Sequence, residues 1–184
     1  VIPLDRLGDY SDGIERINIE LSIGNKLKLL AALEEFLRGD LPLHQPEAPL
    51  APGELIGDRV ERALALIAAT RTRWQWLFAN LDAPFSAFGS AFTVQGSEPE
   101  PEPPNPRPPA PAAHPETVFA ALQDHTLRVS WKEEVRAPLG DIFSGLQFRK
   151  VREQCDAIHA AVLRGRVFVA LHMHAGDGNV HTNL

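Results

Sequence analysis

The feature that most constrains this fold is an apolar segment that runs directly into a turn rich in histidine and glycine, near the end of the 184 residues. The apolar segment is VFVAL at 167–171, and the sequence HMHAGDGNVHTN follows it at 172–183. Its β-branched and aromatic residues favour a strand. Gly176 and Gly178 permit the positive φ angles that a tight connection needs. We therefore predict two strands joined by a glycine turn, the second beginning at Val180.

Histidines on both sides of this turn indicate a metal site. A strand, a turn and a second strand bring side chains from both arms to one point, so we expect His174 and His181 to face the same cavity. Imidazole is a common ligand of divalent metals such as zinc. We interpret Asp177 as a residue that bonds the backbone of the turn, with metal ligation as the alternative, and His172 as a residue that packs beside the site or supports its ligands.

Periodicity predicts the other elements. Alternating polar and apolar residues predict strands, whereas apolar residues that recur every three or four positions predict helices. Gly39 is the expected stop of the first helix. The predicted strands are 16–22 and 126–132, and the predicted helices are 26–37, 55–81, 115–123 and 140–164, the last interrupted near Ser144 and Gly145.

This order predicts an α+β fold, in which an antiparallel-rich sheet carries helices on one face. Residues 96–116 read GSEPEPEPPNPRPPAPAAHPE and hold too little apolar surface to be buried. We predict that they form a flexible proline-rich insertion in a single domain that spans 1–184.

Charge and composition exclude several classes of protein. The formal net charge is −6, which argues against a general nucleic-acid-binding surface. Arg and Trp lie together in 55–81, but we interpret them as a helix surface beside a core edge. A single cysteine, Cys155, excludes an intrachain disulfide and fits a reducing compartment. No apolar run approaches the ~20 residues of a membrane span. We expect a cytoplasmic protein, with peripheral attachment to the inner membrane as the alternative.

The string His174-x-Gly176-Asp177-Gly178-Asn179-x-His181 resembles the signature in the C-terminal domain of FAD-linked oxidases of the vanillyl-alcohol oxidase type. Members similar to this chain include D-lactate and D-2-hydroxyglutarate dehydrogenases and the flavin subunit of glycolate oxidase. The order of Lys132, Pro138 and the strand at 167–171 also resembles that family. The opening DGIERINIELS at 12–22 is similar to a subgroup of large FAD/FMN-containing dehydrogenases.

The resemblance implies a two-domain flavoenzyme that oxidises a small 2-hydroxy acid and passes hydride to FAD. A flavin-binding domain outside these residues would bind most of the FAD, with Asn179 as a cofactor contact. His174 and His181 would hold zinc or manganese, together with a downstream Glu. Lys132 and Asn183 would bind the substrate. Taken alone, this partial C-terminal domain is expected to be inactive and not to bind FAD tightly.

Two other interpretations stay open. An apolar strand followed by His172-x-His174 resembles the metal-binding motif of barrel-type amidohydrolases, although that motif does not explain the glycine turn or His181. Alternatively, the chain is a non-catalytic interaction module whose proline-rich segment binds a partner. Further His and Asp ligands on later strands would favour the hydrolase. The interaction module predicts that His174→Ala has no functional effect.

Overall fold

The computed structural model describes residues 6–44, 52–92, 115–166, 170–173 and 180–183. These residues divide into two compact units. The first unit combines Val1–Phe78 with Val129–Leu184, and the second is Ala79–Arg128. Residues 45–51 and 93–114 lie outside the described residues, so most of the predicted proline-rich insertion is not part of this description.

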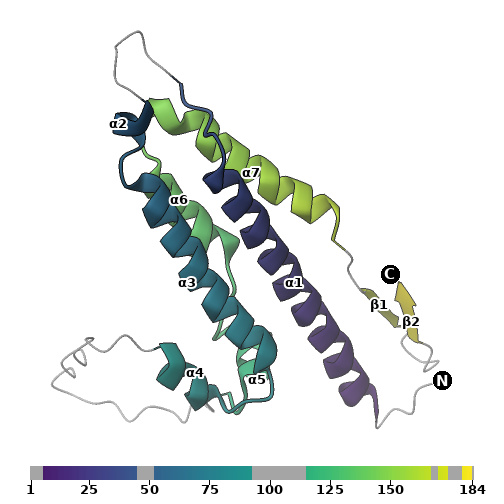
Figure 1. The fold of residues 1–184 in the computed structure, drawn as a ribbon. Coiled ribbons are helices and arrows are strands. Elements are labelled where there is room, and N and C mark those ends of the chain that lie inside the picture. The colour runs from purple at the N-terminus through teal and green to yellow at the C-terminus, as the bar shows by residue number, and fades with distance from the viewer. Residues whose placement is uncertain (1–5, 45–51, 93–114, 167–169, 174–179, 184) are drawn as a thin grey trace, which may run out of the picture. The chain divides into compact units, whose positions relative to one another are not determined.

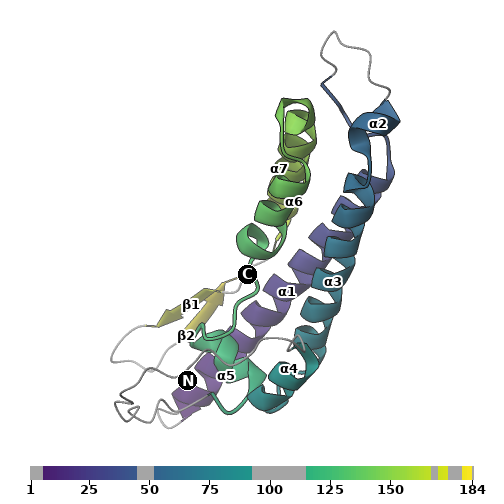
Figure 2. The ribbon, with the colours of Figure 1, turned by 90° about the vertical axis from the view of Figure 1, so that its left-hand side faces the viewer.

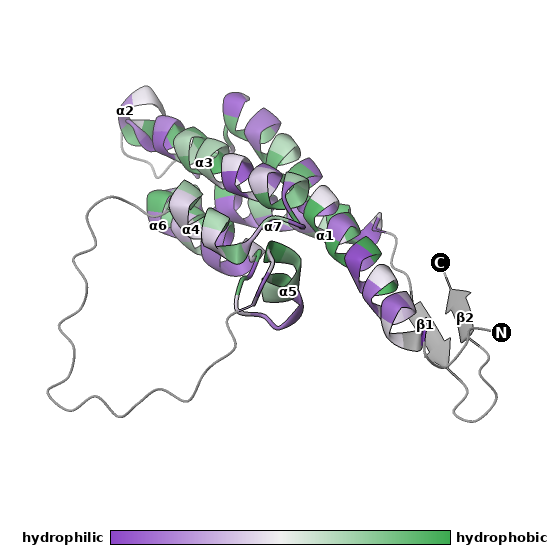
Figure 3. Cartoon of the chain, turned by 90° about the horizontal axis from the view of Figure 1, so that it is seen from below, coloured by the Kyte–Doolittle hydropathy of each residue, from purple (hydrophilic) through white to green (hydrophobic). Residues whose placement is uncertain are grey.

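The first unit begins with one long helix, α1 (Leu7–Arg38). Polar and apolar residues alternate along it in Figure 3, as expected of an amphipathic helix. Its buried residues are Ile23, Leu29, Leu30, Leu33 and Leu37. The helix ends where the sequence predicted, because Gly39 follows its last residue.

The strand predicted at 16–22 is wrong, because these residues belong to α1. Their alternating pattern also satisfies a helix, since Ile17 with Leu21 and Ile19 with Ile23 are spaced four residues apart. Helical geometry allows an ion pair between Arg16 Nε and Glu20 Oε1 at 3.1 Å. A stretch of seven alternating residues does not distinguish the period of a strand from that of a helix when helix-forming sequence follows it directly.

A second long helix packs beside α1. The predicted helix 55–81 is observed as α2 (Pro52–Ile56) and α3 (Arg59–Ala79). Gly57, which has a φ of +52°, lies between them. Figures 1 and 2 both show α3 alongside α1. Arg71 on α3 joins the two helices, because its guanidinium donates to Glu34 and to the Leu30 carbonyl oxygen.

The last helical segment of the first unit has four parts. A π-helical turn η2 (Lys132–Arg136) leads into α6 (Ala137–Ile142). A 3₁₀ turn η3 (Leu146–Phe148) then leads into α7 (Arg149–Arg164), which packs along α1 (Figure 1). The interruption predicted near Ser144 and Gly145 is confirmed, and Gly145 has a φ of +100°.

The strand predicted at 126–132 is also wrong. Asp124 accepts a hydrogen bond from the Thr126 amide at 2.8 Å, which makes a turn at the start of this segment. Helical structure begins at Trp131, because Ser130 caps it. The Ser130 hydroxyl accepts from the Glu133 amide at 3.2 Å, while the Glu134 carboxylate accepts from the Ser130 amide at 2.6 Å.

The core of the first unit lies where α1, α3, η2, α6 and α7 meet. Trp74 and Phe143 are fully buried there. The other buried side chains from these later elements include Ala63, Ile67, Leu77, Val135, Leu139, Phe148, Val151 and Cys155.

The second unit contains α4 (Phe85–Phe92) and α5 (Val118–Gln123). The Thr117 hydroxyl caps α5 by accepting from the Ala120 amide at 3.1 Å. Backbone bonds from Val118 to Ala83 and from Phe119 to Leu81 tie α5 to the segment before α4. The helix predicted at 115–123 is thus observed in its larger part.

The predicted pair of strands at the end of the chain is observed as β1 (Ala170–Met173) and β2 (Val180–Asn183). They are antiparallel, and the register places His172 opposite His181 and Ala170 opposite Asn183. The residues between them, 174–179, lie outside the described residues.

The predicted α+β fold with an antiparallel-rich sheet is contradicted, because the described residues are mostly helical. Among the described residues, the strands form a single two-stranded hairpin. The wrong fold class came from two short segments of alternating residues, 16–22 and 126–132, which were predicted to be strands. None of the described helices combines the length and apolar character that crossing a membrane requires.

Candidate functional site

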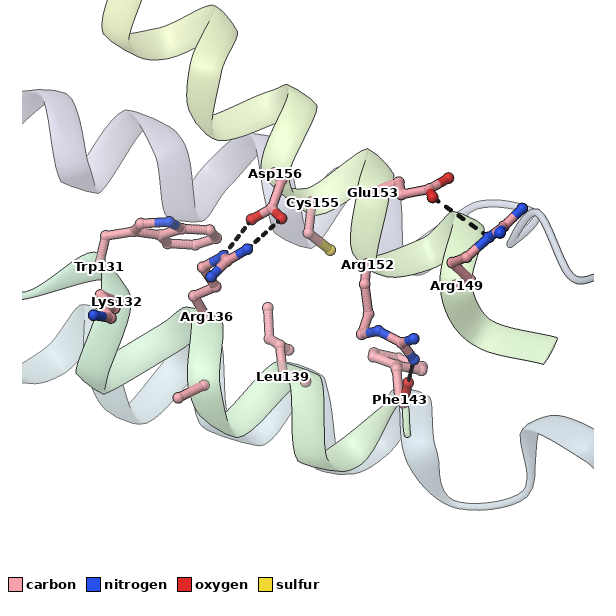
Figure 4. A pocket seen from close by; sticks show the side chains of 12 residues that line it. Trp131, Lys132, Arg136, Leu139, Phe143, Arg149, Arg152, Glu153, Cys155 and Asp156 are labelled. Atoms are coloured by element: carbon pink, nitrogen blue, oxygen red, sulfur yellow. Dashed lines mark hydrogen bonds and ion pairs between the residues drawn. The ribbon is translucent and has the colours of Figure 1, made fainter. Parts of the chain in front are cut away.

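A cavity of about 410 Å³ opens between η2, α6 and α7 (Figure 4). We call it the arginine pocket. The charged side chains that line it come from two segments of the sequence, one before and one after the helix interruption at Gly145. The charged residues are Lys132, Arg136, Arg149, Arg152, Glu153 and Asp156.

Most of these charges are paired within the pocket. Arg136 binds Asp156 with two hydrogen bonds, Nε to Oδ1 at 2.7 Å and Nη2 to Oδ2 at 2.9 Å. Arg149 Nε lies 3.4 Å from Glu153 Oε1. Figure 4 shows both pairs as dashed lines, one between η2 and α7 and the other within α7. Two of the four cations are therefore neutralised by carboxylates.

The other two cations leave an excess of two positive charges. Arg152 Nη1 donates to the carbonyl oxygen of Phe143 and, at 2.9 Å, to that of Gly145. Both acceptors are neutral. The Lys132 side chain is exposed and makes no hydrogen bond or ion pair with the described residues. This pocket therefore offers an uncompensated ammonium to a small anion.

The Arg136–Asp156 pair shifts the pKa values of both of its members. The hydrogen bonds from Arg136 lower the pKa of the Asp156 carboxyl below its usual value. The same bonds raise the pKa of Arg136. Asp156 is thus held as a carboxylate at neutral pH and is committed to Arg136, so it is a poor candidate for a general base.

Apolar side chains line the rest of the pocket. Leu139 and Phe143 from the α6 segment are buried beside Trp131 and Cys155. Burial raises the pKa of the Cys155 thiol to about 12, so this sulfur is neutral at physiological pH and is not a candidate nucleophile. The lining of the arginine pocket thus combines apolar side chains with cationic ones, as small-molecule pockets often do.

The helix start at Ser130 positions Lys132. Glu134 accepts from the Ser130 amide and also binds α3, where its Oε1 accepts from Trp74 Nε1 at 3.1 Å and from Arg73. The next turn is π-helical, with the Ala137 amide bonded to the Lys132 carbonyl oxygen. Such turns are frequent at functional sites, since they reorient side chains within a helix.

The predicted site residues are only partly described. Lys132 lies at the arginine pocket. His181 and Asn183 lie on β2, opposite His172 and Ala170 respectively. His174 and Asn179 lie outside the described residues. Within the described parts of the chain, no group of three or more His, Cys, Asp or Glu side chains is arranged to hold a metal ion.

The three arginines of the pocket, Arg136, Arg149 and Arg152, were not predicted from the sequence. Their spacing carried a signal, because Lys132 and Arg136 are four residues apart, and Arg149 lies three residues before Arg152 and four before Glu153. The pattern Ser130-x-x-Glu133 is likewise a helix-start signature that would have placed this segment correctly. No match was found when the chain was compared with protein-family models, curated proteins and solved structures.

Proposed function

We propose that this chain is the substrate- and metal-binding part of a flavin-dependent dehydrogenase that oxidises a small 2-hydroxy acid. The observation that carries the proposal is the string at 174–181, in which six of eight positions match the signature of FAD-linked oxidases. Its last residue, His181, belongs to β2, and its first follows β1 directly. The antiparallel pairing of β1 with β2, which flank this string in the sequence, supports the proposal.

The arginine pocket gives independent support, because it suits a carboxylate. Within the described parts of the chain, the Lys132 ammonium has no partner and the Arg152 guanidinium donates to two carbonyl oxygens. A volume of about 410 Å³ is ample for an acid of a few carbon atoms. In this proposal the Lys132 ammonium binds the substrate carboxylate as a compact point charge.

The donors of the signature also fit the implied metal. Two imidazoles, from His174 and His181, are suitable ligands for zinc or manganese. When bound, the metal would polarise the substrate hydroxyl, and FAD would accept the α-hydrogen as hydride. Asn183 is assigned to a polar contact with the substrate, and Asn179 to a contact with the cofactor.

The proposed role of Lys132 is tested by substrate binding in the complete gene product that carries this chain. Isothermal titration with D-lactate, D-2-hydroxyglutarate and glycolate gives a dissociation constant for each acid. Lys132→Met removes one charge-assisted contact and is expected to weaken binding about tenfold. Lys150→Met is the matched control, because Lys150 is an exposed lysine on α7 outside the pocket.

The metal role is tested in the same protein. His181→Ala is expected to abolish tight binding of Mn²⁺ or Zn²⁺, whereas Cys155→Ala, which alters a buried thiol, is expected to leave it unchanged. Equal acid affinity in the Lys132→Met and wild-type proteins, together with unchanged metal affinity in His181→Ala, would contradict the proposed function.

A further inference from the structure

A second cavity, of about 160 Å³, lies between α1 and α7. We call it the α1–α7 cavity. Each polar side chain that lines this cavity can donate a hydrogen bond. These residues are Asn18, Ser22, Asn25 and Lys26 on α1, His159 on α7, and Arg166 just after α7.

No carboxylate is among the described residues that line this cavity. Lys26 is half-buried, and its ammonium donates to the Ser22 hydroxyl at 3.1 Å. That is its one hydrogen bond among the described residues, and a hydroxyl carries no compensating charge. Burial lowers the pKa of Lys26, which is the expected response of an ammonium that is partly desolvated without an anionic partner.

The carboxylate that acts on Lys26, Glu134, is already bound to other groups. Glu134 acts on Lys26 through its charge and raises its pKa, but its oxygens accept from Arg73, Trp74 and the Ser130 amide. Arg166 has the opposite effect on Lys26, because it is a second cation at the same cavity. The cavity therefore concentrates two positive charges, and no carboxylate among its described lining residues balances them.

His159 gives the cavity one rigid wall. Its ring stacks on Trp131, with ring centroids 4.6 Å apart and an interplanar angle of 12°. Burial is the main cause that lowers the pKa of His159, so the imidazole is neutral at pH 7. A neutral imidazole held in one orientation offers a hydrogen-bond donor without adding a third charge.

We infer that the α1–α7 cavity binds a phosphate dianion, either free or as the terminal group of a phosphomonoester. Lys26 and Arg166 match its two charges, and the imidazole, amide and hydroxyl groups match a tetrahedral ion that accepts from several directions. The volume suits one such ion. This site is distinct from the arginine pocket and does not depend on the function proposed for it.

The test is calorimetric titration of the purified chain with inorganic phosphate and with glycerol 3-phosphate, at constant ionic strength set by sodium chloride. We expect saturable binding of at least one of them at one site. Tighter binding of glycerol 3-phosphate identifies a phosphomonoester as the ligand, and equal or weaker binding identifies free phosphate. Lys26→Met and Arg166→Gln are each expected to weaken binding about tenfold or more.

Two matched variants separate the site from general charge effects. Lys28 and Arg164 are exposed, lie two residues from Lys26 and Arg166, and do not line the cavity, so Lys28→Met and Arg164→Gln should bind phosphate normally. Lys26→Arg keeps the charge and should retain most of the affinity, which guards against a loss of folding in Lys26→Met. The absence of saturable binding of either compound, or an equal loss in the control variants, would overturn the inference.

Discussion

The indole N–H of Trp74 donates to Glu134 Oε1 at 3.1 Å, and this bond joins α3 to the π-helical turn that carries Lys132. Trp74 is fully buried, so its N–H has no access to water. The same carboxylate accepts from Arg73 and from the Ser130 amide. One side chain therefore fixes the start of the helix that forms the rim of the arginine pocket.

Glu134→Ala should lower the free energy of unfolding by about 2–3 kcal/mol, because it leaves the Trp74 N–H and the Arg73 guanidinium without this acceptor. Urea unfolding followed by tryptophan fluorescence measures the change. Glu133→Ala is the control, since its side chain is exposed and contributes only its backbone amide to the cap. Similar losses in the two variants would show that the Glu134 contacts do not stabilise this joint.

Local sequence patterns predicted an element correctly where the pattern fits one type of secondary structure better than any other. The leucines at 29, 30, 33 and 37 are buried on α1, and Gly39 ends that helix as expected. The two strands predicted on either side of the glycine turn are observed as the antiparallel pair β1 and β2. These features depend on residues close together in sequence, so periodicity and turn chemistry describe them well.

Other parts of the fold were not predictable from alternation alone. Residues 16–22 satisfy both a strand and a helix, and the long helix of which they are a part decided between them. The arginine pocket was missed because it requires Lys132 and Arg136 to meet Arg149 and Arg152 across the break at Gly145. Such a juxtaposition depends on tertiary packing, which single-element patterns do not contain.

The two glycines Gly145 and Gly24 should respond to alanine in opposite directions. Gly145 has a φ of +100° and a ψ of 162°, a conformation that residues with a Cβ rarely adopt, so Gly145→Ala should cost about 1–3 kcal/mol. Gly24 lies inside α1 with no atom near the place of an added Cβ, so Gly24→Ala should stabilise the chain by about 0.5–1 kcal/mol. Thermal unfolding of both variants tests the two signs together.

Stability should fall in alkaline solution through Cys155. Its folded pKa of about 12 exceeds the unfolded value of about 8.5, so the unfolded chain loses the thiol proton first. The contribution is fully present below about pH 8.5 and is lost as the pH rises towards 12. Chemical unfolding at pH 7.5, 9 and 10.5 should therefore show a steeper alkaline loss in the wild type than in Cys155→Ala. Parallel pH profiles would contradict the burial of this thiol.

The Arg136–Asp156 pair should affect acid stability in the opposite sense. The hydrogen bonds from Arg136 lower the folded pKa of Asp156, so this contribution is present above the unfolded pKa of about 3.9 and is lost as the pH falls through the folded value. Asp156→Asn should flatten the acid limb of the stability profile between about pH 5 and 2. Asp141→Asn is a suitable comparison, because Asp141 is an exposed residue of α6 outside the pocket. An unchanged acid limb in Asp156→Asn would exclude a stabilising role for the pair.

The most direct test of the proposed function is the anaerobic visible spectrum of the complete gene product, recorded before and after addition of D-lactate, D-2-hydroxyglutarate or glycolate. We expect a flavin band that one of these acids bleaches, and a failure to bleach in His181→Ala or after chelation of the metal. A protein that carries no flavin, or one whose flavin is bleached equally well in His181→Ala after chelation, would contradict it.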